Sequence, residues 1–347
     1  MWALTLIGYL HFRKDPAKVS KSYPLAVVAK AEGAELVYFS PGRVCWEDET
    51  IRGMFYEAGR WVERTTRFPD VIYNEGQKLT TQNLQTVQKL RARIPFTSYG
   101  VGDKMVVHDK ILTAGQFAQY VIPSVEVRTV DEVWALLDRY RDFVLKPIRG
   151  RQGNGVLYIQ QLVPMHSFCL HEGADKRQVD AEEFRSFIQT RLAGEIHLIQ
   201  RYINCKTKTG AAYDFRLHVQ KDGAARWVVV SIYPRIAAPG QIVSNISNGG
   251  YTNYAKPFLQ QEFGEQWFEM KRYLEHFSLV LAKHLDDIYG ASFDELGIDV
   301  GLDEQQKLWL YEVNWKPGAP PTFYLELDVV RNTVHYAMYL AEKHKVR

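Results

Sequence analysis

The chain has 347 residues, of which 46% are hydrophobic and 24% charged, a composition typical of a globular protein with room for two or three domains. Its 43 lysines and arginines against 40 acidic residues leave a formal net charge of only +3, too small to indicate binding to nucleic acid or to a membrane surface. The three cysteines, Cys45, Cys169 and Cys205, fit no zinc-site spacing and cannot all pair, so we expect a reducing, cytoplasmic location and no disulfide framework.

The first part of the chain alternates predicted strands and helices as a small α/β domain does. Its opening apolar run has no basic residues before it and no small-residue cleavage site, so we interpret it as a buried strand and not as a signal peptide. A proline and a glycine pair near residue 100 end this region, and we expect an N-terminal domain over 1–100. The predicted elements are strands over 2–9, 35–39 and 71–73, helices over 22–32 and 81–92, and a hairpin over 50–66.

The remaining sequence predicts two α+β subdomains, over 101–195 and 196–347. No apolar stretch reaches the roughly 20 residues that a membrane span needs. Asp222-Gly223 is a strong hairpin signal, and the composition of 236–257 predicts a long loop, which is usually functional. The predicted elements are helices over 108–120, 131–140, 181–192, 262–289 and 325–344, strands over 143–145, 156–159, 197–203, 215–220 and 226–232, and a hairpin over 296–318.

The last hairpin carries two acidic residues that we expect to face each other. With a four-residue loop over Glu304–Lys307, Asp299 lies directly opposite Glu312, and Asn314 lies on the same face. Like charges in opposite positions destabilise a sheet, and a cation bound between them removes the repulsion. Oxygen ligands suit Mg²⁺, so these residues are candidate metal ligands. A solvated hairpin face without a metal is the alternative.

The same register divides this hairpin into two faces. The ligand-bearing face also holds two glycines, which leave room beside the carboxylates. We expect the apolar face to consist of Ile298, Val300, Leu302, Trp309, Tyr311 and Val313, and the other face of Gly297, Asp299, Gly301, Leu310, Glu312 and Asn314.

A lysine followed by a glycine-rich loop is the second candidate feature. Lys146 ends a predicted strand, and the loop after it lets backbone N–H groups approach phosphate while the lysine supplies a charge. The spacing fits neither a Walker A loop nor a dinucleotide-binding fingerprint, and strands on both sides predict a flap over a nucleotide. An ordinary flexible turn is the alternative. Lys110 is a candidate second phosphate or adenine contact, or an exposed helix lysine. The loop glycines are Gly150, Gly153 and Gly155.

Two short segments supply candidate contacts to the rest of a nucleotide or substrate. The strand end Gln200–Ile203 can offer backbone N–H and C=O groups to an adenine edge. Asp214 and Arg216 lie two apart, on one face of a strand. Asp214 can accept a hydrogen bond from a ribose hydroxyl, and Arg216 can bind phosphate or a carboxylate. A surface ion pair that contributes little to stability is the alternative.

The long loop supplies the last candidates. Arg235 precedes this loop and Asn245 lies within it. An arginine and an amide close to a metal provide the charge and the hydrogen bonds that stabilise a developing oxyanion. A generic loop rich in glycine and asparagine is the alternative.

The order of these features is more specific than any one of them. A Lys-Pro strand end and glycine-rich loop, Gln-x-x-Ile, Asp-x-Arg, Arg followed by Asn and Gly-Gly, and Asp followed by Glu-x-Asn-x-x-Pro-Gly occur in that order. The chain therefore resembles the ATP-grasp superfamily, with motifs similar to those of ribosomal-protein glutamate ligases. Over nearly its full length it resembles the YheC/YheD family, which is associated with endospore coats. This resemblance rests on GIDVGL and LYEVNWKPG in the last hairpin and, less strongly, on AKAEGAELVYFSP and the GxWxxxxxxFPDVIYN pattern over Gly59–Asn74.

The resemblance implies a fold, an activity and cofactors. The fold is an N-terminal pre-ATP-grasp α/β domain followed by two α+β subdomains that grip the nucleotide. The activity is that of an ATP-dependent carboxylate–amine ligase, which activates a carboxylate as an acyl phosphate that an amine then attacks. ATP and Mg²⁺, or Mn²⁺, are the implied cofactors, and small-molecule or peptide carboxylates and amines are the implied substrates.

The resemblance also implies residue roles. Two residues depart from the family pattern: Glu75 stands in place of a basic residue and Val243 in place of an arginine. These departures bear on the identity of the acceptor substrate and on part of the phosphate contact. The implied catalytic residues are Arg235, Asn245 and Arg216; the implied nucleotide contacts are Lys110, Lys146, Gly150, Gly153, Gly155, Gln200, Tyr202, Ile203, Asp214 and Ser244; the implied metal ligands are Asp299, Glu312 and Asn314.

Two other functions stay open at this point. One is a nucleotide-binding structural protein of the spore coat, which keeps the fold without turnover and adds spore association to the expected location. The other is a kinase-like phosphotransferase, which the complete protein-kinase motif set would indicate and which this sequence lacks.

Overall fold

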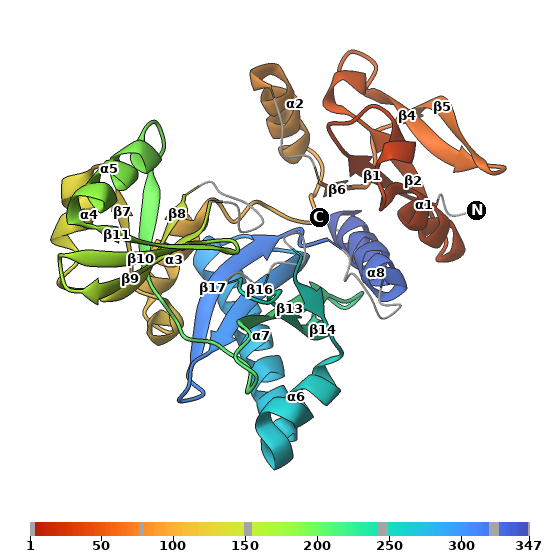
Figure 1. Cartoon of the computed structure of the whole chain (residues 1–347). Helices are drawn as coiled ribbons and strands as arrows, with labels where there is room; N and C mark the ends of the chain where they lie inside the picture. The colour runs from red at the N-terminus through yellow and green to blue at the C-terminus, as the bar shows by residue number, and fades with distance from the viewer. Residues whose placement is uncertain are drawn as a thin grey trace.

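The computed structural model describes residues 4–75, 80–148, 155–241, 244, 249–318 and 326–345. These residues form three sheets of six, six and five strands, which follow one another along the chain and are covered by helices (Figure 1). In this described part, no helix is both long and apolar enough to cross a membrane. The fold class predicted from the sequence, a mixed α/β fold, is confirmed.

The N-terminal sheet contains the predicted βαβ unit. Strand β1 (Thr5–Leu10) is parallel to both β2 (Ala34–Phe39) and β6 (Val71–Asn74), and α1 (Ser22–Ala31) makes the crossover. The predicted hairpin is also present, as β4 (Thr50–Glu57) and β5 (Arg60–Arg67). The sheet order is β3 (Val44–Cys45), β4, β2, β1 and β6, with β5 paired to β4.

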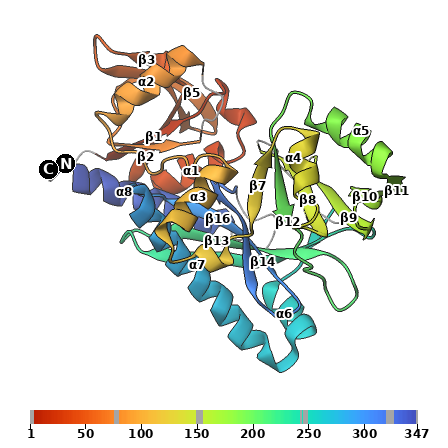
Figure 2. The ribbon, with the colours of Figure 1, turned by 90° about the vertical axis from the view of Figure 1, so that its left-hand side faces the viewer.

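Helices from both ends of the chain cover this sheet. Helix α2 (Thr81–Arg91) covers one face with Val87 and Leu90. On the other face α1 is joined by the C-terminal helix α8 (Glu326–Lys345), as Figure 2 shows. The domain boundaries stay a prediction, but α8 completes a core that starts with β1. The residues that α8 adds are Val330, Val334, Ala337 and Ala341.

The middle sheet is antiparallel and more extensive than the sequence predicts. Pairing along the sheet runs β11 (Asp175–Asp180), β10 (Ser167–Glu172), β9 (Leu157–Val163), β8 (Asp142–Pro147), β12 (His197–Arg201) and β7 (Ser124–Val127). Strands β7, β10 and β11 are not predicted from the sequence: β7 has only four residues, β10 has only a short apolar run, and β11 is almost entirely polar. Helices α4 (Val130–Ala135) and α5 (Ala181–Leu192) pack on it, and the prediction for α5 is confirmed.

Glycines divide two predicted helices. The helix expected over 108–120 is α3 (Lys104–Ala114) followed by a short 3-10 turn over Ala118–Tyr120, since Gly115, with φ of 80°, ends α3. The helix expected over 262–289 is α6 (Ala255–Phe263) and α7 (Trp267–Tyr289), joined by a 3-10 turn that starts at Gly264, whose φ is 58°. A positive φ suits glycine and stops a helix.

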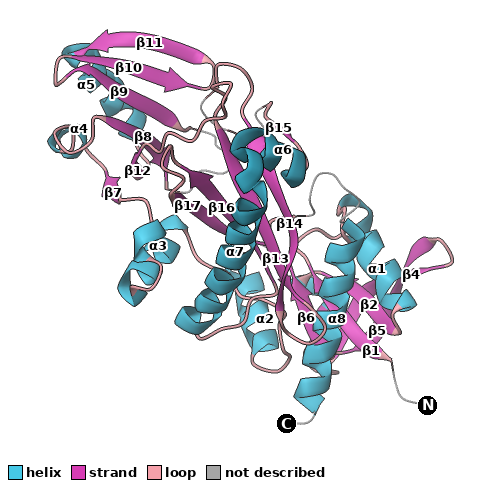
Figure 3. Cartoon of the chain, turned by 90° about the horizontal axis from the view of Figure 1, so that it is seen from below, coloured by secondary structure: helices cyan, strands magenta, loops and turns pink. Residues whose placement is uncertain are grey.

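The third sheet has the order β15 (Tyr251–Thr252), β14 (Trp227–Ile236), β13 (Tyr213–Lys221), β16 (Glu295–Leu302) and β17 (Leu308–Trp315). Helix α7 lies along β13 and β14 (Figure 3) and buries its apolar side, including Leu274 and Leu281, against them. The predicted hairpin over 296–318 is therefore the edge of a larger sheet and not an isolated ribbon.

One residue changes the predicted faces of that hairpin. Asp299 pairs with Glu312 as expected, but a bulge follows, and Val300 pairs with Leu310 instead of Tyr311. Leu310 therefore joins the apolar core, which corrects the predicted faces. Trp309 and Tyr311 instead pack with Ile122 and Ile203. Gly301 permits this arrangement, because a Cβ there would overlap the Tyr311 hydroxyl.

Candidate active site

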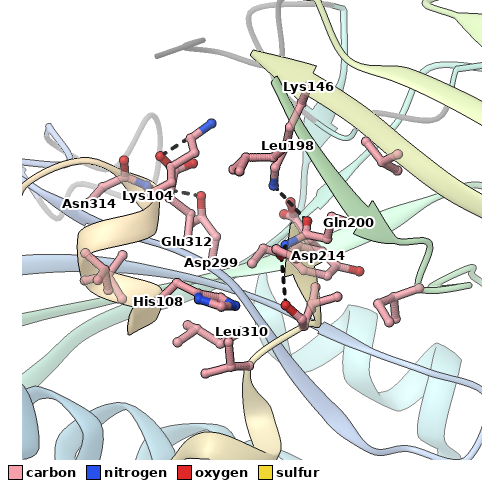
Figure 4. Close-up of a pocket in the computed structure, with 18 of the residues that line it drawn as sticks. Lys104, His108, Lys146, Leu198, Gln200, Asp214, Asp299, Leu310, Glu312 and Asn314 are labelled. Atoms are coloured by element: carbon pink, nitrogen blue, oxygen red, sulfur yellow. Dashed lines mark hydrogen bonds and ion pairs between the residues drawn. The ribbon is translucent and has the colours of Figure 1, made fainter. Parts of the chain in front are cut away.

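A cavity of about 680 Å³ lies between the middle and third sheets, and α3 forms part of its wall. Figure 4 shows that charged and polar side chains from several elements point into it: Lys104 from α3, Lys146 from β8, and Asp299, Glu312 and Asn314 from the β16–β17 hairpin. Its volume lies within the range of small-molecule and cofactor sites.

Strand register brings two arginines and two aspartates together on the floor of the cavity. Arg216 on β13 is opposite Asp299 on β16, and Asp214 is opposite Arg235 on β14. The Arg216 guanidinium donates two hydrogen bonds to Asp299 through Nε and through an Nη atom, the latter at 3.0 Å. Arg235 donates two to Asp214, at 2.6 and 2.7 Å, and approaches Asp299 at 3.0 Å.

This network fixes the charges of its members. Burial opposes ionisation of Asp299, but Arg216 and Arg235 outweigh it and lower the pKa of the carboxyl group. Burial likewise opposes the charge on Arg235, but Asp214 and Asp299 raise its pKa. Asp214, which the sequence suggests as a ribose contact, is bonded to Arg235 and so positions that arginine toward the cavity.

Glu312 differs from Asp299 although the two are directly opposite. Burial raises the pKa of Glu312, Asp299 raises it further, and the Lys104 ammonium, 4.0 Å away, opposes both. Its side chain is 33% exposed, whereas that of Asp299 is 8% exposed. One carboxylate is thus neutralised by arginines and the other faces the cavity with little compensation.

The hairpin residues fit a hard cation in their donor chemistry. Glu312 offers an open carboxylate beside Asp299, and the Asn314 amide nitrogen lies 3.3 Å from Asp299, so its oxygen is left for other partners. Two carboxylates and one amide oxygen suit Mg²⁺. Both Asp299 oxygens accept from Arg216 in this structure, so the open donor atoms are those of Glu312 and the Asn314 oxygen. The structure brings the three predicted ligands together, and the ligation itself stays a prediction.

The opposite wall holds a half-buried lysine, Lys146 on β8. Lys146 Nζ donates to Gln200 Oε1 at 2.7 Å. Burial lowers the pKa of Lys146 to about 8, Lys104 lowers it further, and Glu312 opposes both. Lys146 is thus a cation whose charge depends on pH near neutrality, at a place where phosphate would stabilise it.

The predicted adenine contacts are only partly available. The N–H groups of Arg201 and Tyr202 donate to the carbonyl groups of Pro123 and Asp142, at 3.2 Å each, and so are already used within the protein. The Tyr202 ring packs on Tyr158 with centroids 4.2 Å apart. Tyr202 and Ile203 still line the cavity.

The structure places one predicted residue elsewhere and adds another. Lys110 does not line the cavity, and its ammonium lies 4.7 Å from the centroid of Tyr289. Lys104, six residues or about 1.7 turns earlier on α3, lines the cavity instead. The signal in the sequence that could have located Lys104 is Asp103, which caps α3 by accepting from the N–H groups of Met105 and Val106.

Of the predicted loop residues, two can be placed in the structure. Ser244 is buried and lines the cavity. Gly155 has φ of 72°, and a Cβ there would lie 3.0 Å from Pro147 Cγ, so this position requires glycine. Gly150, Gly153, Val243 and Asn245 lie outside the described residues.

A nucleotide-sized cavity between two antiparallel α+β units, behind an N-terminal α/β sheet, is the arrangement of an ATP-grasp protein. Solved structures share this fold: D-cycloserine synthetase DcsG, with a TM-score of 0.56 at 14% identity, covers 97% of this chain and 99% of its own. The ATP-grasp ligase PsnB, solved with precursor peptide PsnA2 and AMPPNP, gives a TM-score of 0.53 at 13% identity, with 97% and 98% covered.

Within this class, the chain belongs to the YheC/D-like ATP-grasp family, whose model matches residues 93–340. It is similar to the endospore coat-associated protein YheD of Bacillus subtilis, with 24% identity over 339 residues, 92% of this chain and 73% of YheD.

Proposed function

We propose that this protein is an ATP-dependent ligase that joins a carboxylate to an amine. One observation carries the proposal: a single cavity is lined by Lys104 and Lys146, by two arginines paired with Asp214 and Asp299 on its floor, and by the open carboxylate of Glu312. Such an arrangement suits a polyanion bound with a cation. The proposed reaction needs no side-chain nucleophile, so positioning and electrostatics supply the rate.

In the proposed reaction the substrate carboxylate attacks the γ-phosphorus of ATP, the bond to the β-phosphate oxygen breaks, and ADP leaves. An amine then attacks the acyl phosphate carbon, loses a proton and expels phosphate. Lys104 and Lys146 bind phosphate oxygens, and Arg216 and Arg235 stabilise the negative charge on the acyl phosphate and its adduct. Asn245, outside the described residues, is proposed for the same role. Asp299, Glu312 and Asn314 would hold Mg²⁺ or Mn²⁺, which neutralises phosphate charge when bound.

For the two substrates we propose a chemical class and not a particular compound. DcsG is named as a synthetase of the small molecule D-cycloserine, and PsnB was solved with a peptide. We propose small-molecule or peptide carboxylates and amines for this chain, and a cytoplasmic location with spore association.

A non-catalytic nucleotide-binding protein of the spore coat is the second candidate, favoured by the naming of YheD as coat-associated. Incubation with ATP, Mg²⁺ and a pool of amino acids, peptides and metabolites separates the two. The ligase releases ADP and yields a product whose mass equals the sum of two pool members minus water. Nucleotide binding without either result supports the coat protein, and no nucleotide binding at millimolar ATP rejects both.

A further inference from the structure

Three adjacent strands of the middle sheet align a row of polar side chains along the cavity. Gln200 on β12 is directly opposite Ser124 on β7 and Val144 on β8. Lys146 lies two residues beyond Val144, so it shares the same face of the sheet. Ser124, Gln200 and Lys146 all line the cavity.

The hydrogen bonds along this row have a defined direction. The Ser124 hydroxyl donates to the carbonyl oxygen of Ile122 at 2.9 Å, so its remaining capacity is as an acceptor. The Gln200 Nε2 atom donates to that hydroxyl at 2.9 Å. The amide oxygen of Gln200 therefore points the other way and accepts from Lys146 Nζ at 2.7 Å (Figure 4).

The opposite orientation of the amide is unfavourable. It would turn the Gln200 NH₂ group toward an ammonium, which has donors only. The neighbouring charges do not replace the lost acceptor, because Lys104 on α3 repels the ammonium and Glu312 on β17, which attracts it, forms no hydrogen bond with it among those of the described residues. The orientation of one amide thus decides whether Lys146 has a strong acceptor.

We propose that Ser124 is a positioning residue: it orients the Gln200 amide, and through it holds the Lys146 ammonium at the nucleotide end of the cavity. In this role the hydroxyl acts through Gln200, to which it is hydrogen-bonded, and not by binding phosphate itself. The inference rests on the proposed function only in taking Lys146 as a phosphate contact, because the arrangement itself concerns the protein without nucleotide.

Chemical labelling of Lys146 tests this arrangement directly. The full chain is pulsed with acetic anhydride at pH 8 without nucleotide, and acetylation of Lys146 is quantified by peptide mass spectrometry against the exposed Lys176 on β11. In Ser124→Ala the amide loses its anchor and the ammonium is held less well, so more neutral amine is present. We expect Lys146 to react about threefold to tenfold faster.

Matched variants separate positioning from general damage. Ser124→Thr keeps the hydroxyl and should react at the wild-type rate. Ser167→Ala removes a serine from β10 in the same sheet, and should also leave Lys146 unchanged. Ser124→Cys keeps the volume with a weaker acceptor, and replaces the alanine variant if that variant does not fold. Thermal unfolding of every variant is measured in parallel.

Nucleotide binding gives the second readout. Ser124→Ala should weaken MgADP binding about threefold to tenfold, and Ser124→Thr should not. An unchanged Lys146 labelling rate in folded Ser124→Ala or Ser124→Cys would overturn the positioning role. Altered labelling in a protein that binds no nucleotide would instead leave the positioning role intact and count against the proposed function.

Discussion

Two regions of the β16–β17 hairpin carry charged residues, its middle and its open end beside Asp294, but only the middle has capacity left for a ligand. Around Asp299 and Glu312 the hairpin faces the cavity, and Glu312 is incompletely compensated. Around Asp294, Glu295 and Lys316 the hairpin joins the N-terminal sheet and every carboxylate has a buried partner. The comparison shows that charged residues alone do not indicate a binding site, and that an open, incompletely compensated carboxylate is the better candidate.

The joint with the N-terminal sheet is the more saturated region. Glu295 is 1% exposed and lies 2.8 Å from His218 Nε2 and 3.5 Å from the ammonium of Lys21, which immediately precedes α1. Lys316 pairs with Asp294 and lies 3.9 Å from the centroid of the Tyr73 ring on β6. These contacts hold the hairpin against the N-terminal sheet, and each of the two carboxylates has a cationic partner, although Asp294 Oδ1 has no hydrogen bond.

The pKa of a glutamate shifts in opposite directions in these two regions of the hairpin. Burial opposes ionisation of Glu295, but Lys21 and His218 outweigh it and lower its pKa to about 2. At Glu312 burial dominates and the pKa is raised. Glu295 therefore stabilises the fold as a carboxylate, whereas ionised Glu312 opposes it in the absence of a cation.

Removing Glu295 should have the largest effect on the contact between the hairpin and the N-terminal sheet. Glu295→Ala leaves Lys21 buried without its main partner, and breaking such a pair costs about 3–5 kcal/mol. Urea unfolding should show this loss, and Glu295→Gln, which keeps the volume, should recover part of it. A loss as small as that of Glu63→Ala, a surface variant on β5, would mean that the joint contributes no stability.

Acid should separate the two glutamates by the sign of their pH dependence. The unfolded state binds more protons than folded Glu295, so the free energy of unfolding falls as pH drops from about 4.5 to 2, by on the order of 3 kcal/mol. Glu312 has the opposite sign, because stability falls as pH rises above its unfolded pKa. The free energy of unfolding is measured by denaturation at each pH for wild type, Glu295→Gln and Glu312→Gln. The difference between wild type and each variant gives the pH dependence that the glutamate contributes. Slopes of equal sign would contradict the comparison.

Glu312→Ala should affect turnover rather than stability. Loss of a candidate metal ligand should lower ADP release by at least about 10²-fold, roughly 3 kcal/mol in the barrier. The free energy of unfolding should stay within about 0.5 kcal/mol or rise, since repulsion with Asp299 is relieved. Near-normal ADP release would exclude Glu312 as a ligand, and Glu63→Ala serves as the control.

The smallest expected effect concerns Lys146. Its pKa near 8 means that the ammonium is lost as pH rises, so MgADP affinity should fall above about pH 8, by at most tenfold per pH unit. Lys146→Arg stays charged and should remove this dependence. Calorimetry from pH 7 to 9 measures both, and an unchanged wild-type affinity over that range would mean that Lys146 is not a phosphate contact.

Much of the fold could be predicted from local sequence. Strong apolar periods, Asp222-Gly223 and the turn at Gly59 located most strands and hairpins, and the pairing of Asp299 with Glu312 followed from alternation alone. The order of the motifs located the cavity walls, since Lys146, Gln200, Arg216 and Arg235 meet there.

What escaped prediction depends on contacts between distant segments. The bulge after Asp299 requires that the Tyr311 hydroxyl fit against Gly301, a contact that forms only in the folded hairpin. Lys104 is not predicted because the apolar pattern of α3 does not indicate where the helix begins. The N-cap residue Asp103 is the stronger signal for that start. The pairing of Asp214 with Arg235 depends on the register of β13 with β14, which sequence spacing does not specify.

The position of α8 has a consequence for how the chain folds as it is made. The N-terminal sheet closes its core with residues from 330 onward, roughly 250 residues after its last strand, which at 5–20 residues per second is on the order of 10–50 s of synthesis. Until then the apolar surface around Ile7 and Tyr9 is covered by α1 alone and lacks α8. The emerging polypeptide must therefore carry an unfinished domain through the synthesis of both nucleotide-binding units, an interval in which a chaperone can engage it.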